Sequence, residues 1–508
     1  MKALLMYRDR AFDPKQDLPC NAQALAQDLE LDTLLHAMAG EDEFLLGVAH
    51  NALLFGQQTD IDTILYRQAI LKDCLNHPEV VTKLYEVAVA AIESKRTGFW
   101  GGILSNYPGS ILSGSIELLQ RYTDFLRTLR TMAEAHAANF TSEGFTCLFV
   151  MLQQELGDDY LARIQAYLSE LKFTQGVLVS AELGSGNAGV NYMLRKPNPE
   201  KRNWLERIFV KRPPAYTFQI ADRDQAGANA LTQLRDRGIH LAANVLAQSA
   251  DHILSFFEML RTELAFYVGC LNLHARLRGK GEPVAFPVPA AARERKHSFS
   301  GLYDVCLTLG MTPVVVGNAV NADGKSLVII TGANQGGKSS FLRSIGMAQL
   351  MMQCGMFVGA ETFSVGICSG LWTHFKREED KTLKSGKLDE ELDRMSQIVD
   401  HLRPDALLLF NESFAATNER EGSEIARQIV RALLDKRIKV FFVTHMFDFA
   451  RSVHDMNRGD AMFLRANRQP DGSRTFKLVE GEPLATSFGE DLYRKIFEVE
   501  AAAAADAV

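Results

Sequence analysis

The sequence lacks the long apolar runs that membrane-spanning helices require. A helix that crosses a bilayer needs about 18 or more consecutive apolar residues, and no run in these 508 residues approaches that length. The first ten residues, Met1 to Arg10, hold too short an apolar run for a secretory signal. We therefore expect a protein that does not enter the membrane and resides in the cytoplasm.

Paired cysteines and an excess of positive charge are also missing. The seven cysteines are dispersed and form no C-x-x-C pair, which indicates reduced thiols and argues against a zinc site. The formal net charge is −7, so the chain as a whole does not attract nucleic acid. Any contact with DNA must come from a local basic segment.

The pattern of apolar residues changes along the chain, which predicts a multidomain protein. Apolar residues at three- and four-residue spacing indicate an all-α region, and alternating strands and helices indicate an α/β region nearer the C-terminus. We expect these segments: an irregular N-terminal segment, 1–25; helices, 26–175; two short strands and a basic stretch, 176–221; long helices, 222–285; a Gly/Pro-rich linker, 286–297; the α/β domain, 298–498; and an alanine-rich disordered tail, 499–508.

A glycine-rich loop between a strand and a helix dominates the α/β part. Leu327 to Ile330 are apolar and of strand type, and a helical pattern begins near Phe341. Strand, loop, Lys-Ser and helix in this order form the P-loop pattern, whose backbone N–H groups cradle phosphates. A chance glycine turn is the alternative. We expect nucleotide contacts from Gly332, Ala333, Asn334, Gln335, Gly336, Gly337, Lys338, Ser339 and Ser340, with ATP and Mg²⁺ as cofactors.

Two further strands should deliver the remaining chemistry to the same sheet edge. The run 406–410 is apolar and ends in Asn411 and Glu412, and the run 440–444 ends in His445. Ligands bind at the carboxyl ends of strands in open α/β sheets. We therefore expect Ser339 and Asn411 to hold the metal, and Lys338, Glu412 and His445 to be catalytic. A packed histidine is the alternative for His445.

These residues resemble the Walker A loop of the MutS family of mismatch-repair ATPases. The resemblance extends over about 298–498, is weaker over the preceding helices, and implies a P-loop domain of ABC type, a helical core with levers and a reduced clamp. Later stretches that agree in order and spacing are Gly355 to Ala360, Ser385-Gly-Lys (the start of the trans-acting signature loop), Phe410 to Gly422 (Walker B and D-loop), Val443-Thr-His445 and Thr486-Ser-Phe-Gly489.

Three features depart from the family pattern. Asn411 stands where the family has the Asp associated with Mg²⁺, and a neutral amide is a poorer ligand for this cation. Leu388-Asp-Glu-Glu-Leu follows Ser385-Gly-Lys, where the family has Ser-Thr-Phe. Helices begin within about 25 residues, which leaves no room ahead of them for the family's mismatch-reading domain, and the Phe-x-Glu tripeptide of that reader occurs only at 256–258 and 488–490.

A basic stretch with interleaved aromatic residues is the candidate for DNA contact. Lysine and arginine side chains bind backbone phosphates, although a solvated loop at a hairpin tip is the alternative. The candidate residues are Arg195, Lys196, Lys201, Arg202, Arg207, Lys211 and Arg212.

Two functions follow from these features. The first is a MutS-like ATPase, a homodimer with composite nucleotide sites that binds DNA in mismatch repair or another DNA transaction. The second is an ATP-switched assembly module whose arms bind protein, which the negative net charge favours. Salt-dependent DNA binding would separate them.

Overall fold

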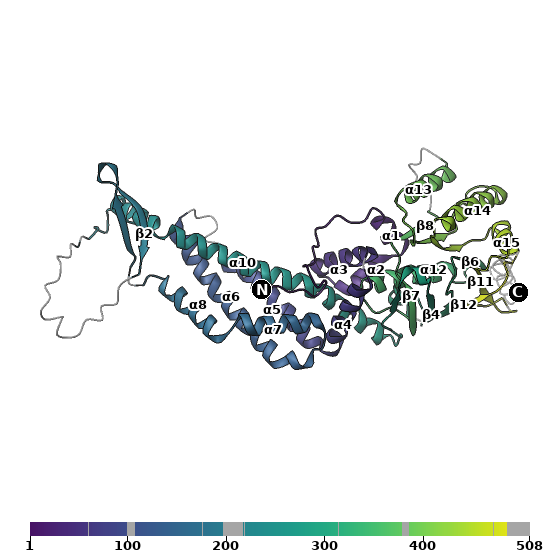
Figure 1. Cartoon of the computed structure of the whole chain (residues 1–508), viewed down its shortest axis with the longest axis horizontal. Helices are drawn as coiled ribbons and strands as arrows, with labels where there is room; N and C mark the ends of the chain where they lie inside the picture. The colour runs from purple at the N-terminus through teal and green to yellow at the C-terminus, as the bar shows by residue number, and fades with distance from the viewer. Residues whose placement is uncertain are drawn as a thin grey trace, which may run out of the picture. The chain divides into compact units, whose positions relative to one another are not determined.

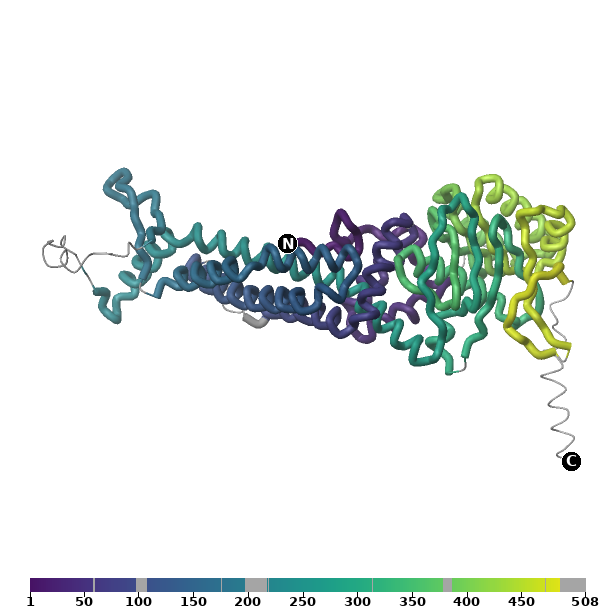
Figure 2. The backbone as a smooth tube through the Cα atoms, turned by 60° about the horizontal axis from the view of Figure 1, so that its bottom comes forward, coloured from purple at the N-terminus to yellow at the C-terminus, as the bar shows by residue number. Residues whose placement is uncertain are grey.

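The computed structural model describes residues 1–58, 60–98, 107–174, 176–196, 217, 219–312, 314–377, 386–470 and 472–484 (Figures 1 and 2). The chain divides into two compact units. Unit 1 comprises 1–3, 82–140 and 145–261, and unit 2 comprises 4–81, 141–144 and 262–508. No helix among the described residues is long and apolar enough to cross a membrane.

Unit 1 is built from helices. It contains all or part of α5 (Pro78–Gly98), α6 (Pro108–His136), α7 (Glu143–Glu155), α8 (Asp158–Glu170) and α10 (Gln225–Gly279), with the short turn η2 (Ala137–Asn139). The expected helical region is thus confirmed. α6 and α10 run side by side in both views (Figures 1 and 2), and the ring of Tyr122 lies 5.7 Å from that of Phe257. The buried stripe that α6 contributes has helical spacing: Leu112, Ile116, Leu119, Tyr122, Leu126, Leu129 and Ala133.

A β-hairpin lies between α8 and α10 in the sequence of unit 1. β1 (Leu178–Leu183) pairs antiparallel with β2 (Gly189–Arg195) across the turn η3 (Ser185–Asn187). The side chain of Val179 sits over Gly238 of α10, where an added Cβ would come within 2.5 Å of a Val179 methyl group. This contact gives a reason for a glycine inside a continuous helix.

Unit 2 begins with a segment held by a buried glutamate. The Glu263 carboxylate accepts hydrogen bonds from the backbone N–H groups of Leu5 (2.8 Å), Met6 (2.6 Å) and Phe12 (2.6 Å). Four helices and a 3-10 turn follow: α1 (Ala22–Asp28), α2 (Leu31–Ala39), α3 (Glu43–Phe55), η1 (Gly56–Gln58) and α4 (Ile61–Asn76). The segment 1–25 is largely irregular, as expected, but Leu5, Met6 and Phe12 are buried in it because Glu263 satisfies their backbone N–H groups.

A six-stranded sheet forms the centre of unit 2. Its order is β12-β11-β6-β10-β9-β8, and all neighbours are parallel except β11 and β12. The strands are β6 (Leu327–Gly332), β8 (Leu371–Phe375), β9 (Leu407–Asn411), β10 (Lys439–Val443), β11 (Ala461–Arg468) and β12 (Arg474–Glu480). β6, β9 and β10 are almost continuously apolar because helices and a second sheet cover both faces.

Helices cover the two faces of this sheet unequally. α13 (Lys387–His401), α14 (Glu419–Asp435) and α15 (Phe447–Asp455) share one hydrophobic cluster with the sheet, and α12 (Lys338–Gln353) packs against the opposite face (Figure 1). The side chains of β10 alternate accordingly. Phe442 belongs to the cluster with α15, whereas the ring of Phe441 lies 4.8 Å from that of His297.

A second sheet and one short helix complete unit 2. The sheet has the order β3-β7-β4-β5, from β3 (Val288–Ala290), β4 (His297–Leu302), β5 (Asn318–Asn321) and β7 (Thr362–Gly366); the helix is α11 (Val305–Gly310). The expected linker 286–297 needs correction, since part of it is the edge strand β3, paired with β7, and another part is the turn η4 (Ala292–Glu294). Pro289 is compatible with this strand because an edge strand need not donate every N–H group.

Candidate functional site

The loop that follows β6 has the backbone geometry expected for phosphate binding. Gly332 and Gly337 have φ values of 106° and 86°, in the region that favours glycine. At Gly332 an added Cβ would lie 2.9 Å from the backbone nitrogen of Ala466, so a side chain does not fit. Gly337 is the N-cap of α12, whose first N–H groups therefore face the loop.

Lys338 lies at the start of α12 and is buried. Its ammonium group donates hydrogen bonds of 3.0 Å to the carbonyl oxygens of Gly332 and Ala333. Burial lowers the pKa of Lys338, and the nearby Glu412 carboxylate opposes this shift. An ammonium group has three N–H donors, so one donor remains after these two bonds.

Ser339 and Asn411 meet where α12 begins and β9 ends. The Ser339 hydroxyl donates to the Asn411 side-chain oxygen at 3.0 Å. Hydroxyl and amide oxygens are ligands that Mg²⁺ accepts, so both residues fit a magnesium ion. Among the described residues, no group of three or more His, Cys, Asp or Glu side chains is placed to hold a metal. A cation here would therefore depend on substrate phosphates and water for its other ligands.

Glu412 and His445 form a pair at the ends of β9 and β10. The Nε2 atom of His445 lies 3.1 Å from a carboxylate oxygen of Glu412, and both side chains are partly exposed. The hydrogen bond from His445 is the main cause that lowers the pKa of Glu412, against an opposing effect of burial. Glu412 therefore stays ionised at lower pH than an ordinary glutamate.

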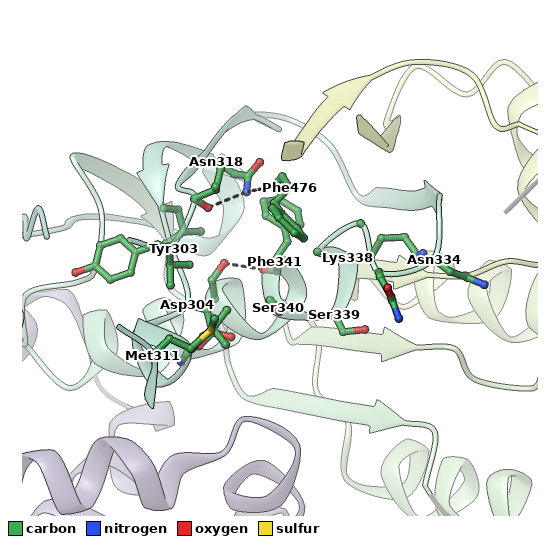
Figure 3. A pocket seen from close by; sticks show the side chains of 18 of the residues that line it. Tyr303, Asp304, Met311, Asn318, Asn334, Lys338, Ser339, Ser340, Phe341 and Phe476 are labelled. Carbon is green, nitrogen blue, oxygen red and sulfur yellow. Dashed lines mark hydrogen bonds between the residues drawn. The ribbon is translucent and has the colours of Figure 1, made fainter. Parts of the chain in front are cut away.

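A cavity of about 900 Å³ opens over this loop (Figure 3). One end is polar and includes Lys338, Ser339, Glu412 and His445. At the other end the labelled side chains are Tyr303 and Asp304, which lie between β4 and α11, and Met311, which follows α11 (Figure 3). The lining also includes a set of apolar residues: Leu302, Leu307, Val314, Val315, Val316 and Phe341. A cavity with a cationic end and an apolar end suits a phosphorylated aromatic ligand.

The structure adds three residues that sequence analysis missed. Arg474 in β12 donates from Nε to the carbonyl oxygen of Asn334 at 3.2 Å, which brings a second cation to the loop. Phe476, also in β12, lines the cavity, and Asn318 fixes the strand by donating to the Phe476 carbonyl oxygen (3.2 Å) and accepting from the Leu478 N–H group (2.8 Å). No local motif marks these residues, because β12 lies about 140 positions after the loop and Asn318 lies in β5, ahead of it.

The expected site residues are therefore gathered in one place. The loop 332–340, Asn411, Glu412 and His445 surround the polar end of the cavity or contact a residue there. His445 is neither fully buried nor packed in the core.

The candidate DNA residues are only partly described. The side chain of Arg195 donates to the Ser180 hydroxyl at 2.8 Å, and Lys196 forms an ion pair with Glu170 at 3.0 Å. Both contacts lie at exposed positions of unit 1. The other candidates, Lys201, Arg202, Arg207, Lys211 and Arg212, lie outside the described residues.

Several family-like segments also fall partly outside the described residues. These are Ser385, the stretch Thr486 to Gly489, the second Phe-x-Glu tripeptide at 488–490 and the alanine-rich tail. Gly386 is the N-cap of α13, so the stretch Leu388 to Leu392 forms the first turns of that helix. The first Phe-x-Glu tripeptide is helical, as expected, and Phe256 is buried.

Comparison with known proteins gives the same family over most of the chain. Residues 59–280 match the MutS2 N-terminal domain, and residues 328–499 match MutS domain V. The chain is 23% identical over 352 residues to Endonuclease MutS2 of Lachnoclostridium phytofermentans, which is 66% of this chain and 44% of the relative. It is 28% identical over 179 residues to DNA mismatch repair protein MutS of Porphyromonas gingivalis, which is 34% of this chain and 20% of the relative.

A shorter match concerns MutS protein homolog 4 of Mus musculus, with 30% identity over 134 residues, or 26% of this chain and 14% of the relative. Each match covers less than half the length of the relative. The two family domains occur in this chain in the order that the motifs predict. The chain belongs to the MutS family.

Proposed function

We propose that this protein binds and hydrolyses ATP with Mg²⁺ in the cavity beside the glycine-rich loop, which acts as a P-loop. The observation that carries the proposal is the convergence of Lys338, the Ser339–Asn411 pair and the Glu412–His445 pair at one end of that cavity. The apolar end offers a place for the base, and the cationic end a place for the triphosphate.

Each residue then has a defined task. Backbone N–H groups of the loop and of the first turn of α12 bind phosphate oxygens. The remaining N–H donor of Lys338 binds the β- and γ-phosphates, and Arg474 adds positive charge at the loop. Ser339 and Asn411 would hold Mg²⁺, which would neutralise charge that develops on the phosphates.

Glu412 would polarise the attacking water. Its carboxylate lies at the end of β9, is ionised at neutral pH, and is oriented by the hydrogen bond from His445. His445 is in turn placed where it can respond to the γ-phosphate, which would make it a sensor of the bound nucleotide.

We propose a homodimer in which two nucleotide sites are completed across the interface, and which acts on DNA in mismatch repair or a related DNA transaction. Seven cysteines without a disulfide support a cytoplasmic location.

Two substitutions test the nucleotide site. Lys338→Ala should abolish tight ATP binding, measured by calorimetry, because the phosphates lose the cation at the base of the loop. Glu412→Gln should retain ATP binding but lower turnover by about two orders of magnitude. Lys436→Ala removes an exposed lysine elsewhere in unit 2 and serves as the control. Unchanged affinity in Lys338→Ala would reject the site, and normal turnover in Glu412→Gln would reject the role of that carboxylate.

A further inference from the structure

A buried histidine connects the residue after Glu412 with helix α13. His374 lies in β8 and is completely buried. Its Nδ1 atom is 2.7 Å from the hydroxyl oxygen of Ser413, and its Nε2 atom is 2.9 Å from the backbone carbonyl oxygen of Glu391 in α13. One side chain therefore contacts both the segment that carries Glu412 and a neighbouring helix.

The chemistry of these contacts fixes the tautomer of His374. Burial lowers the pKa of His374 to about 4, so the ring is neutral at physiological pH and has one N–H group. The carbonyl oxygen of Glu391 can only accept, which places the hydrogen on Nε2. Nδ1 then accepts from the Ser413 hydroxyl. The same hydroxyl lies 2.5 Å from the carbonyl oxygen of His374. Because a hydroxyl has one hydrogen, Ser413 donates to one of these two acceptors at a time, and both belong to residue 374.

A second link joins the same two elements. The side chain of Glu391, which is also buried, accepts a hydrogen bond of 2.8 Å from the backbone N–H group of Phe414. Ser413 and Phe414 are thus both attached to residues outside their own turn. Because these groups are buried, water cannot replace the bonds without cost.

The turn needs such attachments because its backbone is unusual. Glu412 and Phe414 have φ values of 56° and 63°, in the left-handed region that residues with a Cβ rarely occupy. Such conformations persist where the surroundings hold them in place. The orientation of the Glu412 side chain depends directly on this backbone.

We propose that His374 and Ser413 are positioning residues, which hold the Glu412 carboxylate in its working orientation and anchor it to α13. The inference rests on the proposed role of Glu412 in ATP hydrolysis. His374 and Ser413 do not line the cavity, so they act through the backbone of the turn and not by contact with the nucleotide.

Steady-state kinetics of Ser413→Ala in the full chain test this role. We expect kcat to fall by roughly tenfold to a hundredfold, the range for a misplaced catalytic group. KM for ATP should change less than about twofold, because the loop and Lys338 are untouched. Ser423→Ala is the matched control, since its buried hydroxyl has no hydrogen-bond partner among the described residues. Its kcat should remain normal.

A double-mutant cycle separates positioning from general loss of structure. In the Glu412→Gln background, Ser413→Ala should cause no further loss of kcat, because the carboxylate that it positions is already gone. His374→Gln provides a second route if Ser413→Ala does not fold. This substitution removes the ring contacts with Ser413 and Glu391 but keeps the carbonyl oxygen of residue 374 as an acceptor for Ser413, so a fall in kcat in the same direction is expected.

The outcomes are distinct. A normal kcat in both Ser413→Ala and His374→Gln would overturn the inference, and so would an equal fall of kcat with and without the Glu412 carboxylate. If Glu412→Gln does not change the rate of ATP hydrolysis, the proposed role of Glu412 fails, whatever Ser413 does. If the unmodified protein does not bind and hydrolyse ATP, the proposed function itself fails.

Discussion

Glu412 and His445 are the two residues through which pH should act on the site. The hydrogen bond from His445 lowers the pKa of Glu412, so the carboxylate remains ionised as the pH falls below the range where an ordinary glutamate is protonated. A carboxylate that polarises water works only when it is ionised. Turnover should therefore persist into mildly acidic solution and be lost only as the pH falls through the lowered pKa.

The substitution His445→Ala removes the largest cause of this shift. Without the hydrogen bond, only the charges of Lys338 and Lys376 oppose the effect of burial, so the pKa of Glu412 should rise. The acid limb of the profile of kcat against pH should then move to higher pH. This shift is expected whether or not the maximal value of kcat also changes. His454→Ala removes a histidine that faces Asp455 outside the cavity and should leave the limb in place. An unmoved limb in His445→Ala would contradict the prediction.

Asn411 should set the metal requirement of the reaction. Its neutral oxygen accepts from Ser339, and a carboxylate at this position would add a negative charge beside the cation. We expect Asn411→Asp to lower several-fold the Mg²⁺ concentration that gives half-maximal ATPase activity. Asn457→Asp adds the same charge at an exposed turn and should have no effect. An unchanged Mg²⁺ requirement in Asn411→Asp would mean that position 411 does not contact the metal.

At the scale of elements, the sequence predicts the strands that are marked by a pattern in their own residues. β6, β9 and β10 are buried on both faces, so each is a continuous apolar run that ends in polar residues of the site. The glycine-rich loop is also predictable, since its φ angles above zero at Gly332 and Gly337 require residues without a Cβ. The residues at the polar end of the cavity can therefore be predicted from the sequence.

Other parts of the site depend on contacts between distant segments. Arg474 and Phe476 reach the cavity only because β12 pairs antiparallel with β11 at the sheet edge and Asn318 holds it there. The His374–Ser413 pair depends on the adjacency of β8 and β9. β3 contains a proline and only three residues, so its strand character comes from pairing with β7 and not from propensity.

At the scale of the whole molecule, charge limits how this protein would bind DNA, the partner that we propose for it. The net charge of −7 opposes a general attraction to DNA, so binding must depend on local basic residues such as those between 195 and 212. Of these, Arg195 and Lys196 are already engaged with Ser180 and Glu170, and each must exchange or share that contact to bind a phosphate.

Contacts with phosphates carry no information about base sequence. Phe256, the aromatic residue of the helical Phe-x-Glu tripeptide, is buried and does not offer a ring to a distorted base step. We therefore expect DNA binding that tolerates different DNA structures and weakens steeply with salt. Matched, mismatched and branched duplexes, titrated at two salt concentrations, should differ little in affinity.

Neutralising Arg195, Lys196, Lys201 and Arg202 together should weaken this binding several-fold. The dependence of log K on log salt should become shallower, because each lost phosphate contact removes roughly 0.9 from the slope. The control neutralises four exposed basic residues of unit 2, namely Lys15, Arg293, Arg431 and Lys436. It changes the net charge equally and should leave the slope almost unchanged. Equal slopes for the two quadruple variants would locate the DNA contact elsewhere. A preference for a mismatch above about tenfold, or roughly 1.4 kcal/mol, would require a base-reading element that the stretch 195–212 does not provide.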